Sequence, residues 1–97
     1  MEISVQSIKF DADQKLLDFV QKKVSKLERF DAGVSSVDVS LALLEKPDNK
    51  LVKLQANVPG DVLIIERSAK TFEEALNDSV DAMKEKIVRN KERRSEQ

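Results

Sequence analysis

Two segments in which every second residue is apolar constrain the fold more than any other feature of this chain. In residues 37–43 every odd position is apolar, and in residues 52–58 every even position is apolar. A period of two is typical of a β-strand with one buried side and one solvent-facing side. Residues 45–50 (EKPDNK) lie between them and have the composition of a hairpin loop. The sequence therefore predicts two strands that share one covered face.

Two shorter segments predict further strands. Residues 2–8 carry Ile3 and Val5 on one side and polar residues on the other. Residues 59–61 (PGD) predict a tight turn after the strand at 52–58, and the β-branched residues 62–65 begin a fourth strand. Four strands are expected in all.

Residues 12–29 predict the first helix, because their apolar residues recur every three or four positions. This apolar stripe consists of Leu16, Val20, Val24 and Leu27. Asp11 or Asp13 can accept hydrogen bonds from the free N–H groups at the start of the helix, and Gln14 stands three residues after Asp11, as a capping box requires. Gly33 lies just beyond the helix, where a glycine can take the left-handed conformation that ends a helix.

A second, longer helix is predicted from Thr71 to about Arg93. Thr71 and Glu74 form a capping box at its start. Its predicted buried residues are Phe72, Leu76, Val80, Met83 and Ile87. We therefore expect one domain over residues 1–97 with an α+β fold. Its two layers follow the order β-α-β-β-β-α, with a four-stranded sheet and both helices on one face.

The composition argues against catalysis. The chain has no histidine, cysteine, tyrosine or tryptophan, so the commonest general base and the best nucleophile are missing. Without thiolate or imidazole the usual zinc sites are excluded, and the two glycines form no phosphate-binding loop. We expect no enzyme activity, no cofactor and no small-molecule substrate. We also expect a cytoplasmic protein, since the sequence shows neither a secretory signal nor a membrane-spanning apolar run.

Charge is segregated along the chain, although the net charge is only −1. Residues 15–29 carry five basic and two acidic residues, and residues 84–94 carry six basic and two acidic residues. At about 100° per residue, the first helix has a stripe opposite its apolar side, made of Lys15, Lys22, Lys26 and Arg29. On the second helix one flank consists of Lys86, Arg89 and Arg93, and the other of Lys84 and Lys91. Between the flanks runs an acidic ridge, made of Glu74, Asp78, Asp81, Glu85 and Glu92.

These stripes have two interpretations. Any charged helix exposes such faces to solvent, and their ion pairs contribute only tenths of a kcal/mol each. Alternatively, the first helix and one flank of the second form a basic cleft for a phosphate backbone. Arg67, near the end of the fourth strand, is open to the same two readings. With four phenylalanines and no other aromatic residue, recognition of bases by stacking is disfavoured.

The whole chain resembles the ribosome hibernation-promoting factor and ribosome-associated inhibitor family, also called sigma-54 modulation proteins. In the first helix the residues that match the family pattern are Phe19, Val20, Lys23, Lys26, Leu27, Glu28 and Phe30. Gly60 and Leu63 match its Gly-x-x-Leu entry to the fourth strand. The last helix matches at Asp81, Met83, Ile87, Arg89 and Lys91. The chain departs from the family at residues 71–77 (TFEEALN), where an acidic residue followed by Met-Tyr-Ala-Ala-Ile-Asp is usual.

The resemblance implies the same β-α-β-β-β-α fold and a translation regulator that binds the small ribosomal subunit and its ribosomal RNA. Such a protein occupies the channel of messenger RNA and transfer RNA and keeps ribosomes inactive under stress. The chain ends soon after the second helix, so we expect neither an additional dimerisation domain nor a long acidic tail. We also expect a monomer when the protein is not bound to the ribosome.

The candidate RNA-binding residues come from two sources. The resemblance supports Lys23, Lys26, Arg89 and Lys91. Charge geometry alone supports Lys22, Arg29, Lys86, Arg93 and Arg94. Two alternative functions remain open at this point. One is a protein-interaction module that modulates a transcription factor through the acidic ridge, and the other is a double-stranded RNA-binding domain.

Overall fold

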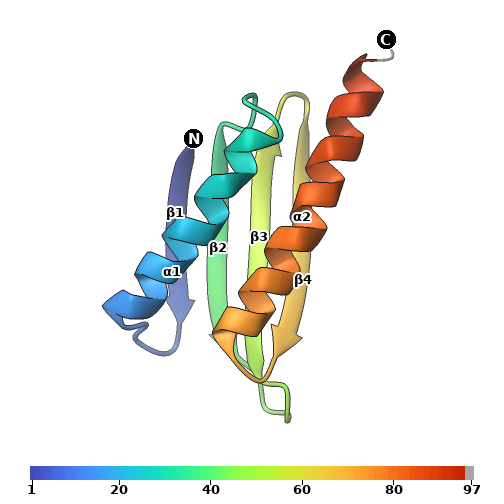
Figure 1. Cartoon of the computed structure of the whole chain (residues 1–97). Coiled ribbons are helices and arrows are strands. Elements are labelled where there is room, and N and C mark those ends of the chain that lie inside the picture. The colour runs from blue at the N-terminus through green and yellow to red at the C-terminus, as the bar shows by residue number, and fades with distance from the viewer. Residues whose placement is uncertain (96–97) are drawn as a thin grey trace.

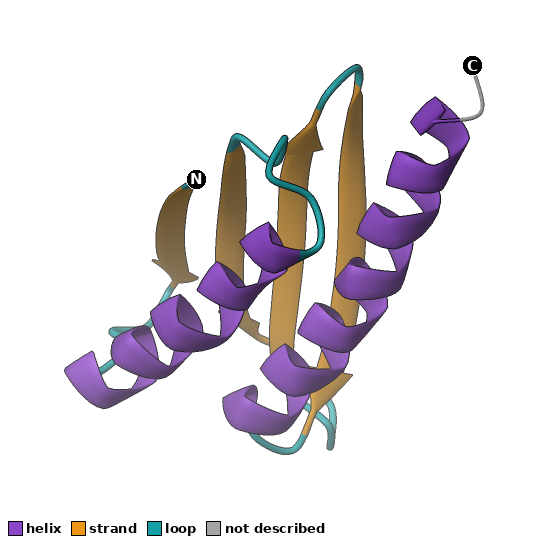
Figure 2. Ribbon diagram, turned by 45° about the horizontal axis from the view of Figure 1, so that its top comes forward, coloured by secondary structure: helices purple, strands orange, loops and turns teal. Residues whose placement is uncertain are grey.

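A computed structural model of the chain, which describes residues 1–95, has a four-stranded sheet with two helices on one of its faces (Figure 1, Figure 2). The elements are β1 (Glu2–Ile8), α1 (Gln14–Ser25), the short 3₁₀ helix η1 (Lys26–Arg29), β2 (Ser36–Leu43), β3 (Lys50–Val58), β4 (Asp61–Ala69) and α2 (Phe72–Ser95). The predicted fold class and element order are confirmed. The fourth strand is longer than its β-branched start suggests, and the first helix tightens into 3₁₀ geometry for its last turn.

The strands lie in the order β1-β2-β3-β4. β1 and β2 are parallel, whereas the two following pairs are antiparallel. A parallel pair needs a crossover connection, and α1 with η1 supplies it. The chain then continues through two hairpins and returns across the same face as α2, so the two helices lie side by side over the sheet (Figure 1).

The core lies between the helices and one face of the sheet. The register aligns Val39, Leu54 and Ile65 across three strands, and each is buried on the helix-covered face. From the helices, the side chains fully buried against this face include Val20, Val24, Leu27, Leu76, Met83 and Ile87. Burial of such a side chain stabilises the fold by about 1.5–3 kcal/mol, so this layer accounts for most of the favourable free energy.

Three predicted core residues lie at the margin of this layer. Leu16 and Val80 are half-buried and pack against the outside of the buried core. Leu43 continues the alternation of β2 but is 46% exposed, since it stands at the end of the strand. The period of two predicts the side of the sheet correctly, but it does not predict how far the helices extend over it.

Side chains cap both helices at their N-termini. Asp13, rather than Asp11, is the N-cap of α1, and its Oδ1 accepts a hydrogen bond of 2.8 Å from the backbone N–H of Leu16. At α2, Thr71 Oγ1 accepts a bond of 3.1 Å from the backbone N–H of Glu74, as the capping-box pattern predicts. The ring of Phe72, the first residue of α2, stacks on Phe10 from the β1–α1 connection with centroids 5.1 Å apart.

The prediction for Gly33 is wrong. It does not have a positive φ angle, unlike Gly60 in the turn between β3 and β4, whose φ is 77°. Gly33 is instead required by close packing, because a Cβ atom there would lie 2.8 Å from Pro59 Cγ and 3.0 Å from Asp31 Oδ1. No helix within residues 1–95 is long and apolar enough to cross a membrane.

We predict that Gly33→Ala lowers the free energy of unfolding by about 1–3 kcal/mol, because the new methyl group overpacks the contact with Pro59. Urea denaturation of the wild type, Gly33→Ala, Pro59→Ala and the double variant measures this effect. Pro59→Ala should recover part of the loss in the double variant, since it removes the ring that the methyl group meets. If Gly33→Ala is as stable as the wild type, or if the two changes are additive, this account of Gly33 is wrong.

Candidate nucleic-acid interface

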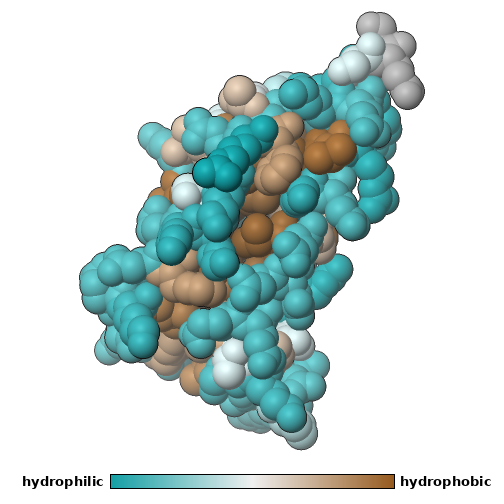
Figure 3. Space-filling view, viewed as in Figure 1, coloured by the Kyte–Doolittle hydropathy of each residue, from teal (hydrophilic) through white to brown (hydrophobic). Residues whose placement is uncertain are grey.

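A groove runs between α1 with η1 on one side and α2 on the other. Leu16 and Phe19 of α1 line a hollow of about 580 Å³ that reaches Glu73 of α2. Phe30, just after η1, and Val88 of α2 line a second hollow of about 410 Å³. Figure 3 shows the corresponding apolar strip between two hydrophilic ridges, which are the exposed sides of the helices. The groove therefore has an apolar floor and polar walls.

Lysines stand on both walls of this groove. From α1, Lys23 Nζ lies 5.5 Å from the ring centroid of Phe19. From α2, Lys84 Nζ lies 4.8 Å from the ring centroid of Phe30. Lys15 and Lys22 border the first hollow and Lys91 borders the second. We call these five residues the groove lysines: Lys15, Lys22, Lys23, Lys84 and Lys91.

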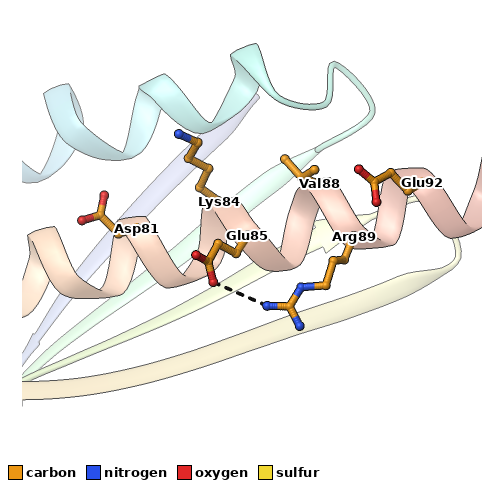
Figure 4. Close-up of a pocket in the computed structure, with 6 residues that line it drawn as sticks. All are labelled: Asp81, Lys84, Glu85, Val88, Arg89 and Glu92. Atoms are coloured by element: carbon orange, nitrogen blue, oxygen red, sulfur yellow. Dashed lines mark hydrogen bonds and ion pairs between the residues drawn. The ribbon is translucent and has the colours of Figure 1, made fainter.

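The other basic flank of α2 points away from α1 (Figure 4). Lys86 Nζ donates a hydrogen bond of 3.1 Å to the backbone carbonyl oxygen of Ile64 in the edge strand β4. Figure 4 shows Lys84 pointing toward α1, while Arg89 points away from it. Arg89 forms an ion pair of 3.4 Å with Glu85, and both side chains are more than two-thirds exposed (71% and 72%). We call this side the outer flank, which consists of Lys86, Arg89 and Arg93.

The predicted RNA-binding residues are therefore divided between two surfaces. Lys22, Lys23 and Lys91 border the groove, whereas Lys86 of the outer flank contacts β4. Lys26 and Arg29 belong to η1 and are exposed. Two groove lysines, Lys15 and Lys84, are not among the predicted RNA-binding residues. Lys84 is spaced seven residues from Lys91, but the sequence does not show which flank of α2 faces α1.

Arg94 has a structural role. Its guanidinium donates to the carboxylate of Asp31, and its Nε lies 3.0 Å from Asn90 Oδ1. The Asp31 carboxylate also accepts a hydrogen bond of 2.8 Å from the backbone N–H of Gly33, and Asp31 is only 5% exposed. Arg94 thus joins the end of α2 to the loop before β2. RNA binding by Arg94 stays a prediction, because its guanidinium is already paired.

Two further charged features, Arg67 and the acidic ridge of α2, lie at the surface. Arg67 Nη1 donates a bond of 2.7 Å to the carbonyl oxygen of Glu66, on its own strand. The acidic ridge of α2 is exposed along its whole length, and part of it borders a shallow surface hollow beside Lys84 (Figure 4). Within residues 1–95 no three histidine, cysteine, aspartate or glutamate side chains are grouped so that they could hold a metal ion.

Comparison with known proteins shows the family of this chain. The model of the family described as Sigma 54 modulation protein / S30EA ribosomal protein matches residues 3–95. The chain belongs to this family. The search of curated proteins found no match.

Two solved structures share the fold of this family member. The N-terminal domain of Thermus thermophilus Protein Y superposes with a TM-score of 0.81 at 23% sequence identity, covering 92% of this chain and 98% of that one. A ribosomal subunit interface protein from Coxiella burnetii superposes with a TM-score of 0.86 at 13% identity, covering 94% of this chain and 98% of that one. At these identities the superpositions show that the fold is the same.

We predict that Arg94→Ala lowers the free energy of unfolding by about 1–3 kcal/mol, because it leaves the buried Asp31 carboxylate without its cation. Lys91 is exposed and lies one turn earlier on α2, so Lys91→Ala should change the free energy of unfolding by less than about 0.5 kcal/mol. Chemical denaturation of the two variants tests the difference. Equal stability of the two would contradict a structural role for Arg94.

Proposed function

We propose that this protein is a non-catalytic translation regulator that binds the small ribosomal subunit through its ribosomal RNA. In this proposal it occupies the channel of messenger RNA and transfer RNA anticodons and keeps the ribosome inactive. Membership of the Sigma 54 modulation / S30EA ribosomal protein family supports the association with ribosomes. The neighbouring structure described as a ribosomal subunit interface protein agrees with it. A cytoplasmic location and a monomeric state off the ribosome belong to the same proposal.

The observation that carries the RNA-binding part is the placement of lysines on both walls of one groove. α1 contributes Lys22 and Lys23, and α2 contributes Lys84 and Lys91 from the facing side. A phosphate backbone that follows the groove meets cations from both helices. Each neutralised phosphate releases condensed counterions, which favours binding at moderate ionic strength.

The neighbouring basic residues extend this surface. Lys26 follows Lys22 by one turn, and Arg29 follows Lys26 by one 3₁₀ turn, so both continue the wall of α1. The outer flank stands apart, and we assign it a smaller contribution to RNA binding. Recognition in this arrangement depends on backbone charge and on the shape of the folded RNA.

Charge reversal on the two walls tests the proposal. We predict that Lys26→Glu combined with Lys84→Glu abolishes co-sedimentation with small ribosomal subunits at near-physiological salt, with little loss of stability, because both side chains are exposed. The matched control is Arg89→Glu combined with Arg93→Glu. It removes the same number of positive charges from the outer flank and should weaken binding much less. Equal loss in both double variants would contradict the assignment to the groove, and wild-type binding by both would contradict RNA binding by this face.

A second prediction separates RNA binding from a role of the acidic ridge in protein recognition. Replacing Glu74, Asp81 and Glu85 by glutamine should leave ribosome binding intact or strengthen it, because repulsion from the phosphates decreases. Co-sedimentation at two salt concentrations measures the change. A clear loss of binding would favour a protein partner on the ridge.

A further inference from the structure

The free edge of β4 is one of the two edges of the sheet, and it runs beside the outer flank of α2. The two-residue turn at Pro59 and Gly60 makes Val58 and Asp61 a hydrogen-bonded pair. Backbone groups in an antiparallel ladder alternate between the partner strand and the opposite side. The N–H and C=O groups of alternate residues therefore point to the free edge, starting with Val62 and including Ile64 and Glu66.

Side chains of the protein itself occupy three of these edge groups. Lys86 Nζ donates to the Ile64 carbonyl oxygen at 3.1 Å. Arg67 Nη1 donates to the Glu66 carbonyl oxygen at 2.7 Å, and the Val62 N–H donates to Asp61 Oδ1 at 2.7 Å. These side chains belong to exposed residues, so each can leave its backbone partner without disturbing the core.

The edge also carries apolar surface that the monomer leaves uncovered. Val62 is 46% and Ile64 is 45% exposed, and both side chains lie on the sheet face opposite the helices. A neighbouring strand would cover such residues with its own side chains. An uncovered strand edge with exposed β-branched residues is a template for pairing with another chain.

We infer that the β4 edge is a pairing surface for a second copy of this chain and that Lys86 keeps it closed. In an antiparallel pairing that places Ile64 opposite the Ile64 of the second copy, the edge N–H and C=O groups of each β4 strand face those of the other. This pairing also places Asp61 opposite the partner's Arg67, and Arg67 opposite the partner's Asp61. Opposite charges in directly facing positions stabilise a strand pair. The edge is therefore complementary to itself in this register.

Two features of α2 oppose this pairing. The Lys86 ammonium is bonded to the Ile64 carbonyl oxygen, at the centre of the register, so the pairing strand must displace it. The twofold axis that relates two antiparallel strands of one sheet is perpendicular to the sheet. The α2 helices of the two copies would therefore lie on the same face of the joined sheet, with their outer flanks facing each other. Their like charges repel. A single strand pair buries much less than the roughly 800 Å² per partner of a stable interface. The Lys86 hydrogen bond and the charge repulsion are therefore enough to keep the wild-type protein monomeric.

Removal of Lys86 tests the inference without ribosomes. Sedimentation equilibrium of Lys86→Ala should show a dimer whose dissociation constant is at least about tenfold lower than that of the wild type. Backbone amides of Val62, Ile64 and Glu66 should gain protection from hydrogen exchange as the protein concentration rises. The matched control is Lys84→Ala, which removes the same charge two residues away on the groove side and should self-associate no more than the wild type.

Two second-site changes in the Lys86→Ala background identify the surface. Ile64→Pro removes an N–H that points to the free edge, and Ile64→Lys places like charges opposite each other across the twofold axis. Each should restore the monomer, and circular dichroism checks that the fold is kept. The inference is overturned if Lys86→Ala remains as monomeric as the wild type, if Lys84→Ala associates equally, or if the folded Ile64→Lys double variant still dimerises.

Discussion

The burial of a single sheet face governs the rest of this structure. The alternation in β2 and β3 gives the sheet one apolar side, and both helices must cover that side because no other part of the described chain can. Two helices side by side on a sheet of four strands meet along one line, and their polar sides stand on either side of that line. The groove and its opposed lysines follow from this packing. The solvent-exposed face of the sheet and its two free strand edges follow from this packing as well.

The same constraint explains how much of the fold the sequence predicts. Periodicity predicts which side of each element is buried, because the hydrophobic effect acts on local patterns of exposure. It therefore anticipates Val39, Leu54 and Met83 as core residues correctly. The role of Gly33 could not be predicted in this way, because the space around it is limited by Pro59, which is distant in sequence and contacts Gly33 only in the folded chain. The choice between Asp11 and Asp13 as the helix cap likewise depended on where the β1–α1 connection ends.

The candidate site is less readable from the sequence than the fold. A helical wheel separates Lys84 from Lys86, but it cannot show which one faces α1, because that depends on the direction in which α2 crosses the sheet. The structure makes Lys84 part of the groove and turns Lys86 toward the edge of β4. Arg94 shows the converse limit. It extends the basic pattern of α2 in sequence, but its charge is already balanced by a buried aspartate 63 positions away.

The contact of lysines with phenylalanine rings has a consequence for how the groove meets a ligand. The ammonium groups of Lys23 and Lys84 lie over Phe19 and Phe30, and such contacts are worth about 0.5–1 kcal/mol at exposed sites. A free lysine side chain has up to about 2 kcal/mol of rotamer entropy to lose when it is immobilised. Lysines already restrained by an aromatic ring lose less of it on binding. The phenylalanines of the groove thus act as supports that preorganise the charges.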